Sequence, residues 1–149
     1  MRAVVQRVSD CSVTADGTVT GRIDTGILVY LGVEKDDTDE DLDYIVDKTT
    51  GLRIFADSEG KMNLSVVDVG GSVLTVSQFT ICADTRKGRR PSYNPAAPPD
   101  MGERYYREYI DAVGNMGITV AEGSFGAYMK VSYTNEGPVT IILDSKKRI

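Results

Sequence analysis

The sequence contains no histidine and only two cysteines among its 149 residues. Without histidine, the chain by itself cannot supply a Ser-His-Asp triad, a Cys-His pair or a histidine-ligated zinc site. Catalysis would therefore use hydroxyl groups, carboxylates, amides, lysine, tyrosine, the backbone or groups on the substrate. Cys82 lies near the polar motif described below, but no histidine can activate it, so we do not expect a thiolate nucleophile.

Other absences bear on the compartment and the partners. Cys11 and Cys82 are too few for a disulfide framework and form no CxxC motif, which is typical of a reducing compartment. No apolar run approaches the roughly 18 residues of a membrane span, and the first residues do not read as a signal segment. We expect a cytoplasmic protein without a membrane partner. The net charge of −5 argues against indiscriminate nucleic-acid binding but leaves room for a local basic patch.

The length favours one domain over residues 1–149, which can fold without a disulfide or a metal. Helices are predicted over 39–51, after an N-cap at Thr38, and from Asp100 to Gly117. The run 27–33 predicts a central buried strand, and Asp16-Gly17 predicts a hairpin turn. The other predicted strands are 1–8, 11–15, 18–23, 53–56, 72–81, 118–121, 128–134 and 139–143. This order predicts an α+β fold with a mainly antiparallel, barrel-like sheet and two main helices.

Ser77-Gln78-Phe79-Thr80 ends a buried strand and precedes a long loop. Polar side chains at the end of a strand commonly form binding or catalytic sites. The alternative is that serine and threonine merely cap the strand. In a regular strand Ser77 and Thr80 point to opposite faces. They share a pocket only if the strand bends or ends between them; otherwise a site there uses backbone amides near Phe79 and Thr80.

The long loop, residues 82–99, carries four clustered cations and is of a length usually found in functional or disordered segments. The cations are Arg86, Lys87, Arg89 and Arg90. Such a cluster on an otherwise acidic protein suits a phosphate backbone, and the alternative is a solvated charged surface.

Near the C-terminal end, Gly137-Pro138 lies between two predicted strands. Glycine has the least restricted backbone, and a cis peptide bond is essentially confined to X-Pro. Such a pair can present two main-chain carbonyls with no side chain in the way. The simpler interpretation is an ordinary connection with a trans proline.

Motifs along nearly the whole chain resemble those of the D-aminoacyl-tRNA deacylases, also called D-tyrosyl-tRNA deacylases. In order they are MRAVVQRVS, LGVEKDD, LRIF, GKMNLS, VSQFTI, ADTRKGRRPSY, AAPP, FGA and NEGPVT. The resemblance runs from Met1 to Leu143. Departures are Gly51, Tyr93-Asn94-Pro95 and Tyr128, where the family pattern has Asn, a Phe-containing stretch and an acidic residue. These departures concern loop contacts and not the reaction.

The resemblance implies a homodimer that hydrolyses the ester joining a D-amino acid to the terminal ribose of tRNA, with no metal, no other cofactor and no DNA partner. It also implies that Gly137-Pro138 is cis and enters the active site of the other subunit. Two carbonyls near the substrate α-carbon would exclude an L-amino acid sterically, and glycine, lacking a side chain, would be partly accepted.

By the same resemblance, the catalytic residues are Ser77, Gln78, Phe79 and Thr80, and Arg7 braces the Gly-Pro segment. Phe125, Met129 and Tyr133 are expected around the pocket, and Arg86, Lys87, Arg89 and Arg90 on tRNA phosphates. The nucleophile in this family is attributed either to the threonine or to attack assisted by the ribose 2′-hydroxyl. Because no histidine can activate Thr80, we favour the second. Two rivals stay open: a non-catalytic RNA-binding dimer and an esterase acting on small aminoacyl esters.

Overall fold

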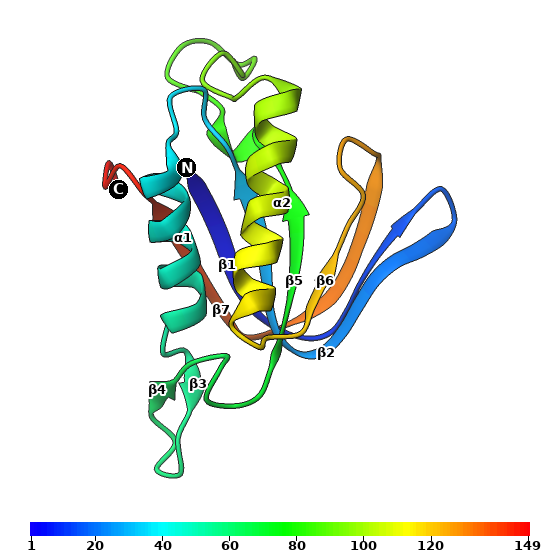
Figure 1. Ribbon diagram of the computed structural model, residues 1–149, viewed down its shortest axis with the longest axis vertical. Helices are drawn as coiled ribbons and strands as arrows, with labels where there is room; N and C mark the ends of the chain where they lie inside the picture. Colours follow the sequence, from blue (N-terminus) through cyan, green and yellow to red (C-terminus); the bar gives the residue numbers. More distant parts are fainter.

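A five-stranded sheet forms the centre of the molecule, and two helices cover one of its faces (Figure 1). The computed structural model describes all residues from 1 to 149. The strands of this sheet are β1 (Arg2–Ala15), β2 (Thr18–Gly32), β5 (Ser72–Ser77), β6 (Val120–Glu122) and β7 (Met129–Asp144). The helices are α1 (Asp39–Gly51) and α2 (Pro99–Asn115). A small hairpin of β3 (Phe55–Ala56) and β4 (Met62–Leu64) and a 3₁₀ helix, η1 (Phe79–Cys82), complete the fold.

The sheet is mixed, with the strand order β6-β5-β2-β1-β7. β1 pairs antiparallel with β2 and β7, whereas β5 runs parallel to both β2 and β6. The α+β class with two helices is confirmed. The expected mainly antiparallel, barrel-like sheet is corrected: half of the strand pairings are parallel, and β6 and β7 remain separate edges. The cause is that α1 and α2 serve as crossovers, and a crossover returns the chain to the end of the sheet from which a parallel strand starts.

β1 and β2 are each one long strand where the sequence predicted two. The break expected after Val8 is a local irregularity, at which Asp10 has φ +49° and the pairing with β7 shifts register. Val8 and Cys11 consequently pack into the same core cluster although they are three residues apart. The predicted hairpin turn is confirmed, with Asp16 and Gly17 both at positive φ as a type I′ turn requires.

The larger of two core clusters lies between the sheet and the helices, with 18 buried residues. The tyrosines of α2 belong to it, and Tyr109 shares a hydrogen bond of 2.9 Å with the Thr49 hydroxyl of α1. α1 begins as predicted, with the Thr38 N–H donating to Asp41 Oδ2 at 2.8 Å. Neither helix is long and apolar enough to span a bilayer. A smaller cluster of seven buried residues fills the opposite face.

Candidate active site

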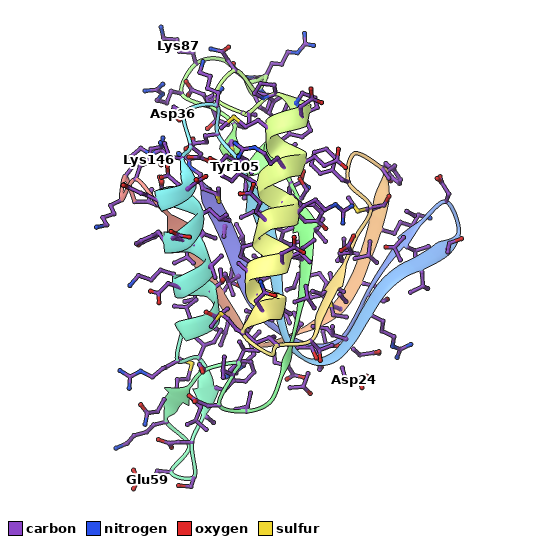
Figure 2. All side chains as sticks on the ribbon, in the orientation of Figure 1. Asp24, Asp36, Glu59, Lys87, Tyr105 and Lys146 are labelled. Carbon is purple, nitrogen blue, oxygen red and sulfur yellow. The ribbon has the colours of Figure 1, made fainter.

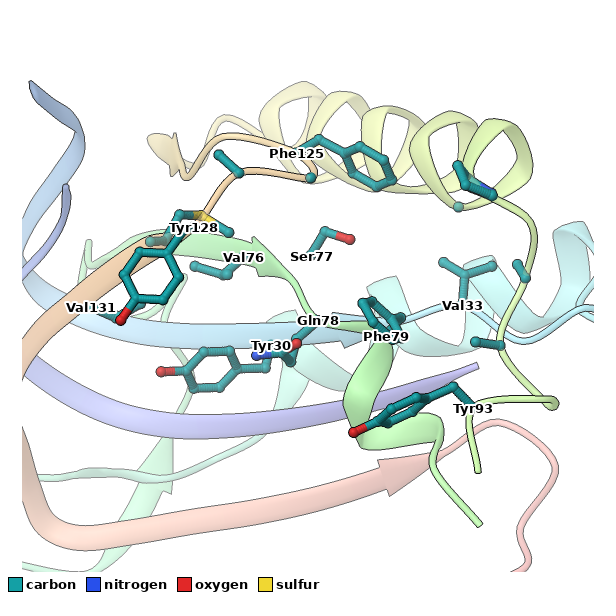
Figure 3. Close-up of a pocket in the computed structure, with 17 residues that line it drawn as sticks. Tyr30, Val33, Val76, Ser77, Gln78, Phe79, Tyr93, Phe125, Tyr128 and Val131 are labelled. Atoms are coloured by element: carbon teal, nitrogen blue, oxygen red, sulfur yellow. The ribbon is translucent and has the colours of Figure 1, made fainter. Parts of the chain in front are cut away.

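A cavity of about 690 Å³ opens beside the C-terminal end of β5 (Figure 3). Three segments form its walls: residues 76–79, the stretch 93–102 leading into α2, and the 125–131 turn into β7. Twelve of its 17 lining residues are hydrophobic. A largely apolar cavity of this size with a few polar groups at one side is the usual form of a small-molecule or nucleotide-end site.

The polar side of the cavity is where β5 stops. The strand ends at Ser77 and η1 begins at Phe79, so the chain does turn between Ser77 and Thr80, as a shared site requires. The Gln78 N–H donates to the Leu31 carbonyl of β2 at 2.8 Å, which fixes this turn to the central strand. Ser77, Gln78 and Phe79 line the cavity. Thr80 lies one residue further along η1, is exposed, and is not among the lining residues.

Exposed aromatic rings border the cavity on two sides (Figure 3). Phe79 and Tyr93 pack edge to face, with ring centroids 5.2 Å apart and an interplanar angle of 80°. Tyr128, on the turn into β7, has 84% of its surface exposed. Tyr93 and Tyr128 are two of the departures from the family pattern, and both line the cavity, so the departures fall on the walls of the candidate site itself.

Two of the three expected pocket residues line the cavity. Phe125 does so with its ring tilted against Tyr106 at 5.9 Å, and Met129 does so with its sulfur accepting the Ser124 N–H at 3.3 Å. Tyr133 does not line the cavity. Its side chain packs against the smaller core cluster. Tyr133 shares the face of Met129 and Val131 but lies further along β7, beyond the cavity.

Tyr30 is a lining residue that the sequence analysis missed. Burial raises the pKa of its hydroxyl, and a hydrogen bond with Tyr133 raises it further. The Tyr133 hydroxyl donates in turn to Gln6 Oε1 at 2.8 Å. The sequence gives little signal for this arrangement, because Gln6, Tyr30 and Tyr133 lie on three different strands.

Gly137-Pro138 lies inside β7, and its peptide bond is cis. The two strands predicted on either side of it are one strand, because both parts pair with β1. The pairing passes from Asn135 opposite Val8 to Thr140 opposite Gln6, so the Gly-Pro segment bulges out of the ladder. Both residues are exposed, and neither lines the cavity of its own chain.

Arg7, which the resemblance assigns to bracing the Gly-Pro segment, lies against this bulge. Its Nε donates to the Glu136 carbonyl at 3.3 Å and its Nη1 to the Ile54 carbonyl at 2.7 Å. An ideal Cβ on Gly137, whose φ is +115°, would lie 2.8 Å from Arg7 Nη2 and 2.8 Å from Val139 Cγ2. The bulge is therefore packed so closely that only glycine fits at this position without displacing a neighbour.

The four loop cations differ in their partners. The Arg86 guanidinium donates two hydrogen bonds to Asp84, at 2.9 and 2.7 Å, and these bonds hold the pKa of the Asp84 carboxyl well below its usual range. Lys87, Arg89 and Arg90 are exposed and have no ion pair. Figure 2 shows Lys87 at the end of the molecule near the start of α2. Arg86 is thus committed within the loop, and the other three are available to a ligand.

An acidic group, Glu34, Asp36 and Asp37, has the spacing of cation ligands. Each carboxylate already forms a salt bridge. The Met1 ammonium lies 2.5 Å from Asp37 Oδ1, and Arg148 Nη2 lies 2.5 Å from Glu34 Oε2. Lys146 Nζ lies 3.4 Å from Asp36 Oδ2. None of the three carboxylates lines the cavity. The group forms an ion-pair network that fixes the chain ends.

Comparison with known proteins points to one family. The model of the family described as D-Tyr-tRNA(Tyr) deacylase matches residues 4–144. A D-aminoacyl-tRNA deacylase of Thermosipho africanus is 53% identical over 147 residues, covering 99% of both chains. One of Geobacter sulfurreducens is 55% identical over 148 residues, covering 99% of this chain and 97% of that protein.

Two solved structures share the fold. One, described as c-Myc DNA unwinding element binding protein, has a TM-score of 0.91 and 39% identity, covering 97% of this chain and 98% of that one. The other, a probable eukaryotic D-amino acid tRNA deacylase, has a TM-score of 0.82 at 20% identity, covering 95% and 97%. Since the family model and the relatives span nearly all of its length, this chain belongs to the D-Tyr-tRNA(Tyr) deacylase family.

Proposed function

We propose that this protein hydrolyses the ester bond of D-aminoacyl-tRNA, releasing the free D-amino acid and tRNA, as a step of translation quality control. The observation that carries the proposal is the apolar cavity ending at Ser77, Gln78 and Phe79, in a chain more than half identical to proteins named D-aminoacyl-tRNA deacylase. A cavity of about 690 Å³ has room for an aminoacyl group and the terminal adenosine.

The backbone at the start of η1 is suited to stabilise an oxyanion. The N–H groups of Phe79 and Thr80 belong to the first turn of that helix, where no acceptor exists within the helix. Backbone donors held in place before the reaction stabilise the charge that develops on the ester oxygen. Ser77 and Gln78 order the same turn and present the polar groups of the cavity.

Chiral selection is assigned to Gly137-Pro138 of a second copy in a homodimer. Both residues are exposed and lie outside the cavity of their own chain, which suits a segment that serves a neighbouring subunit. Main-chain carbonyls close to the α-carbon would clash with an L side chain and tolerate a D side chain. Glycyl-tRNA, which has no side chain to exclude, is then a secondary substrate.

The attack on the ester is assigned to chemistry assisted by the ribose 2′-hydroxyl rather than to Thr80. Thr80 is exposed, is not a lining residue, and has no histidine anywhere in the chain to act as its base. Thr80→Ala should keep near-normal turnover of D-Tyr-tRNA. Trapping of an acyl ester on Thr80 would contradict this assignment.

The test is the release of amino acid from D-Tyr-tRNA and L-Tyr-tRNA, measured side by side in the presence of a chelator. We expect rapid loss of the D ester while the L ester is spared. Cleavage of both esters would still identify an esterase but would contradict the role of Gly137-Pro138 in excluding L-aminoacyl groups. Equal activity on a D-tyrosyl ester lacking tRNA would identify a small-molecule esterase instead.

A second candidate is nucleic-acid binding without turnover. It is favoured by one observation, the 39% identity to a protein described as binding a DNA unwinding element. The same assay, combined with a tRNA-binding measurement, separates the two: tRNA binding without ester loss from either substrate would establish the second candidate.

A further inference from the structure

The bulge at Gly137-Pro138 interrupts the β1–β7 ladder more than a common bulge does. Between the paired positions Gln6 and Val8, β1 has the single residue Arg7, while β7 has the four residues 136–139. A common bulge places only two residues opposite one. Backbone carbonyls within such an interruption lose their partners across the ladder and need other donors.

The Asn135 side chain supplies these donors. Its Nδ2 donates to the carbonyl of Arg7 at 3.1 Å and to the carbonyl of Val139 at 3.0 Å, one on each strand. Its Oδ1 accepts from Gln6 Nε2 at 3.0 Å and lies 3.4 Å from Thr140 Oγ1. Both donors and at least one acceptor site of the amide are therefore used, because the single Thr140 hydroxyl proton goes either to Asn135 Oδ1 or to the Pro138 carbonyl. This one side chain closes the ladder across the bulge.

The same group of hydrogen bonds reaches the main chain of the Gly-Pro pair. Thr140 Oγ1 lies 3.3 Å from the Pro138 carbonyl and accepts from Gln6 Nε2 at 3.2 Å. On the opposite side, the Arg7 guanidinium donates to the Glu136 carbonyl. The carbonyl of Pro138 is thus contacted from the side of Asn135, whereas the arginine holds the residue that precedes the glycine.

We infer that Asn135 is a positioning residue for chiral selection: its side-chain amide sets the direction in which the main chain of Gly137-Pro138 projects. The inference rests on the proposed function, in which those carbonyls exclude L-aminoacyl groups. Steric exclusion depends on carbonyl positions to a fraction of an ångström, so a bulge with two unsatisfied carbonyls would select poorly while the cavity remained intact.

The test compares kcat/KM for D-Tyr-tRNA and L-Tyr-tRNA in the wild-type protein and in Asn135→Asp. The substitution keeps the side-chain shape, removes both donors, and sets a carboxylate oxygen against the carbonyls of Arg7 and Val139. We expect the D-over-L ratio to fall at least tenfold, mainly through faster hydrolysis of the L ester. The Kd for tRNA should stay within twofold, because the change lies outside the cavity.

The matched control is Thr49→Val, which removes a buried hydrogen bond to Tyr109 between the two helices. It should destabilise the fold comparably and leave the D-over-L ratio unchanged. A fall in the ratio in both variants would assign the effect to general loss of stability and overturn the inference. An unchanged ratio in folded Asn135→Asp would overturn it as well.

Thr140→Val serves where Asn135→Asp does not fold, since Thr140 is exposed. The substitution removes the hydroxyl, which lies beside the Pro138 carbonyl and accepts from Gln6 Nε2. We expect a fall in the ratio of about threefold with no change in Tm, and an unchanged ratio would count against the inference. The measurement on the wild-type protein distinguishes failure of the proposed function from failure of the inference about Asn135. A wild-type protein that does not prefer the D ester overturns the proposed function, whereas a selective wild type with equally selective variants overturns only the role of Asn135.

Discussion

The two faces of the central sheet differ in how completely the chain itself buries them. On the helix-covered face, 18 buried residues form one core, and polar groups such as Thr49 and Tyr109 find partners within it. The opposite face buries only seven residues, adjoins the cavity, and leaves Ile142 on β7 with 61% of its surface exposed. One face is completed by the chain itself. The other is buried less completely and adjoins the cavity, so stability and selectivity should respond to different substitutions.

The largest expected effect lies on the helix-covered face. Ile45 is fully buried in the larger cluster, and Ile45→Ala should lower the free energy of unfolding by about 2–5 kcal/mol through reduced burial and a residual cavity. Urea denaturation measures the decrease. The D-over-L ratio, measured well below the unfolding temperature, should not change. A change in that ratio would mean that the two faces are coupled.

Gly137→Ala tests the bulge between β1 and β7, where Arg7 and Val139 crowd Gly137. The added Cβ lies 2.8 Å from Arg7 Nη2 at a backbone φ of +115°, so we expect a decrease of about 1–3 kcal/mol in unfolding free energy. Here selectivity should fall together with stability, because the strain is located in the segment that we propose excludes L substrates. Paired measurements of Tm and of the D-over-L ratio check this. A lower Tm with an unchanged D-over-L ratio would mean that Gly137 takes no part in excluding L substrates.

Alkaline pH should weaken the fold through its buried thiols. Burial raises the pKa of Cys11 and of Cys82 to about 11, whereas an unperturbed thiol titrates near pH 8.5. A raised pKa in the folded state keeps this stability in full below about pH 8.5 and loses it as the pH rises toward 11, by roughly 1–2 kcal/mol per thiol. Unfolding free energies at pH 8 and 10.5, under reducing conditions, measure the fall. Cys11→Ala should reduce the fall, and a flat profile would contradict the assignment.

The smallest effect on stability belongs to the basic loop. Replacing Arg89 and Arg90 with alanine should change the unfolding free energy by less than about 0.5 kcal/mol, because both are exposed and unpaired. The dependence of tRNA affinity on salt should flatten, by roughly 0.7–0.9 in slope for each phosphate that is no longer neutralised. Arg86→Ala is the control, since Arg86 is held by Asp84, and it should flatten the slope less. If the salt dependence of tRNA affinity is the same in all variants, the loop cations are solvated surface charges that do not contact tRNA.

The sequence predicted those helices, strands and turns that depend on neighbouring residues. It did not predict features that depend on contacts between residues far apart in the chain. The Thr38 cap, the Asp16-Gly17 turn and the buried strand 27–33 each depend on neighbouring residues, and each was predicted correctly. Parallel pairing of β5 depends on where crossovers return the chain, so the sheet type was predicted wrongly. The Asn135 bonds were invisible because one partner, Arg7, lies 128 positions away.

The same cavity shows this limit at the level of single residues. The motif at 77–80 was recognised, and the end of β5 brings Ser77, Gln78 and Phe79 to the cavity wall. Tyr133 was expected beside Phe125 and Met129 but lies outside, since its place depends on how far along β7 the cavity extends. Tyr30 reaches the wall from the central strand, and nothing in its immediate sequence distinguishes it from a core residue.

The pairing of β7 with β1 also bears on how the molecule is made. These two strands join residues 129–144 to residues 2–15, so the sheet cannot be completed until nearly the whole polypeptide has left the ribosome. Contacts between such distant segments slow folding, and the unpaired edge of β1 stays exposed to other chains while synthesis continues. The segment that carries Gly137-Pro138 is therefore the last part of the sheet to be installed. The 18 buried residues of the larger cluster all precede β7, so a nascent chain can begin to pack this core before it acquires the bulge.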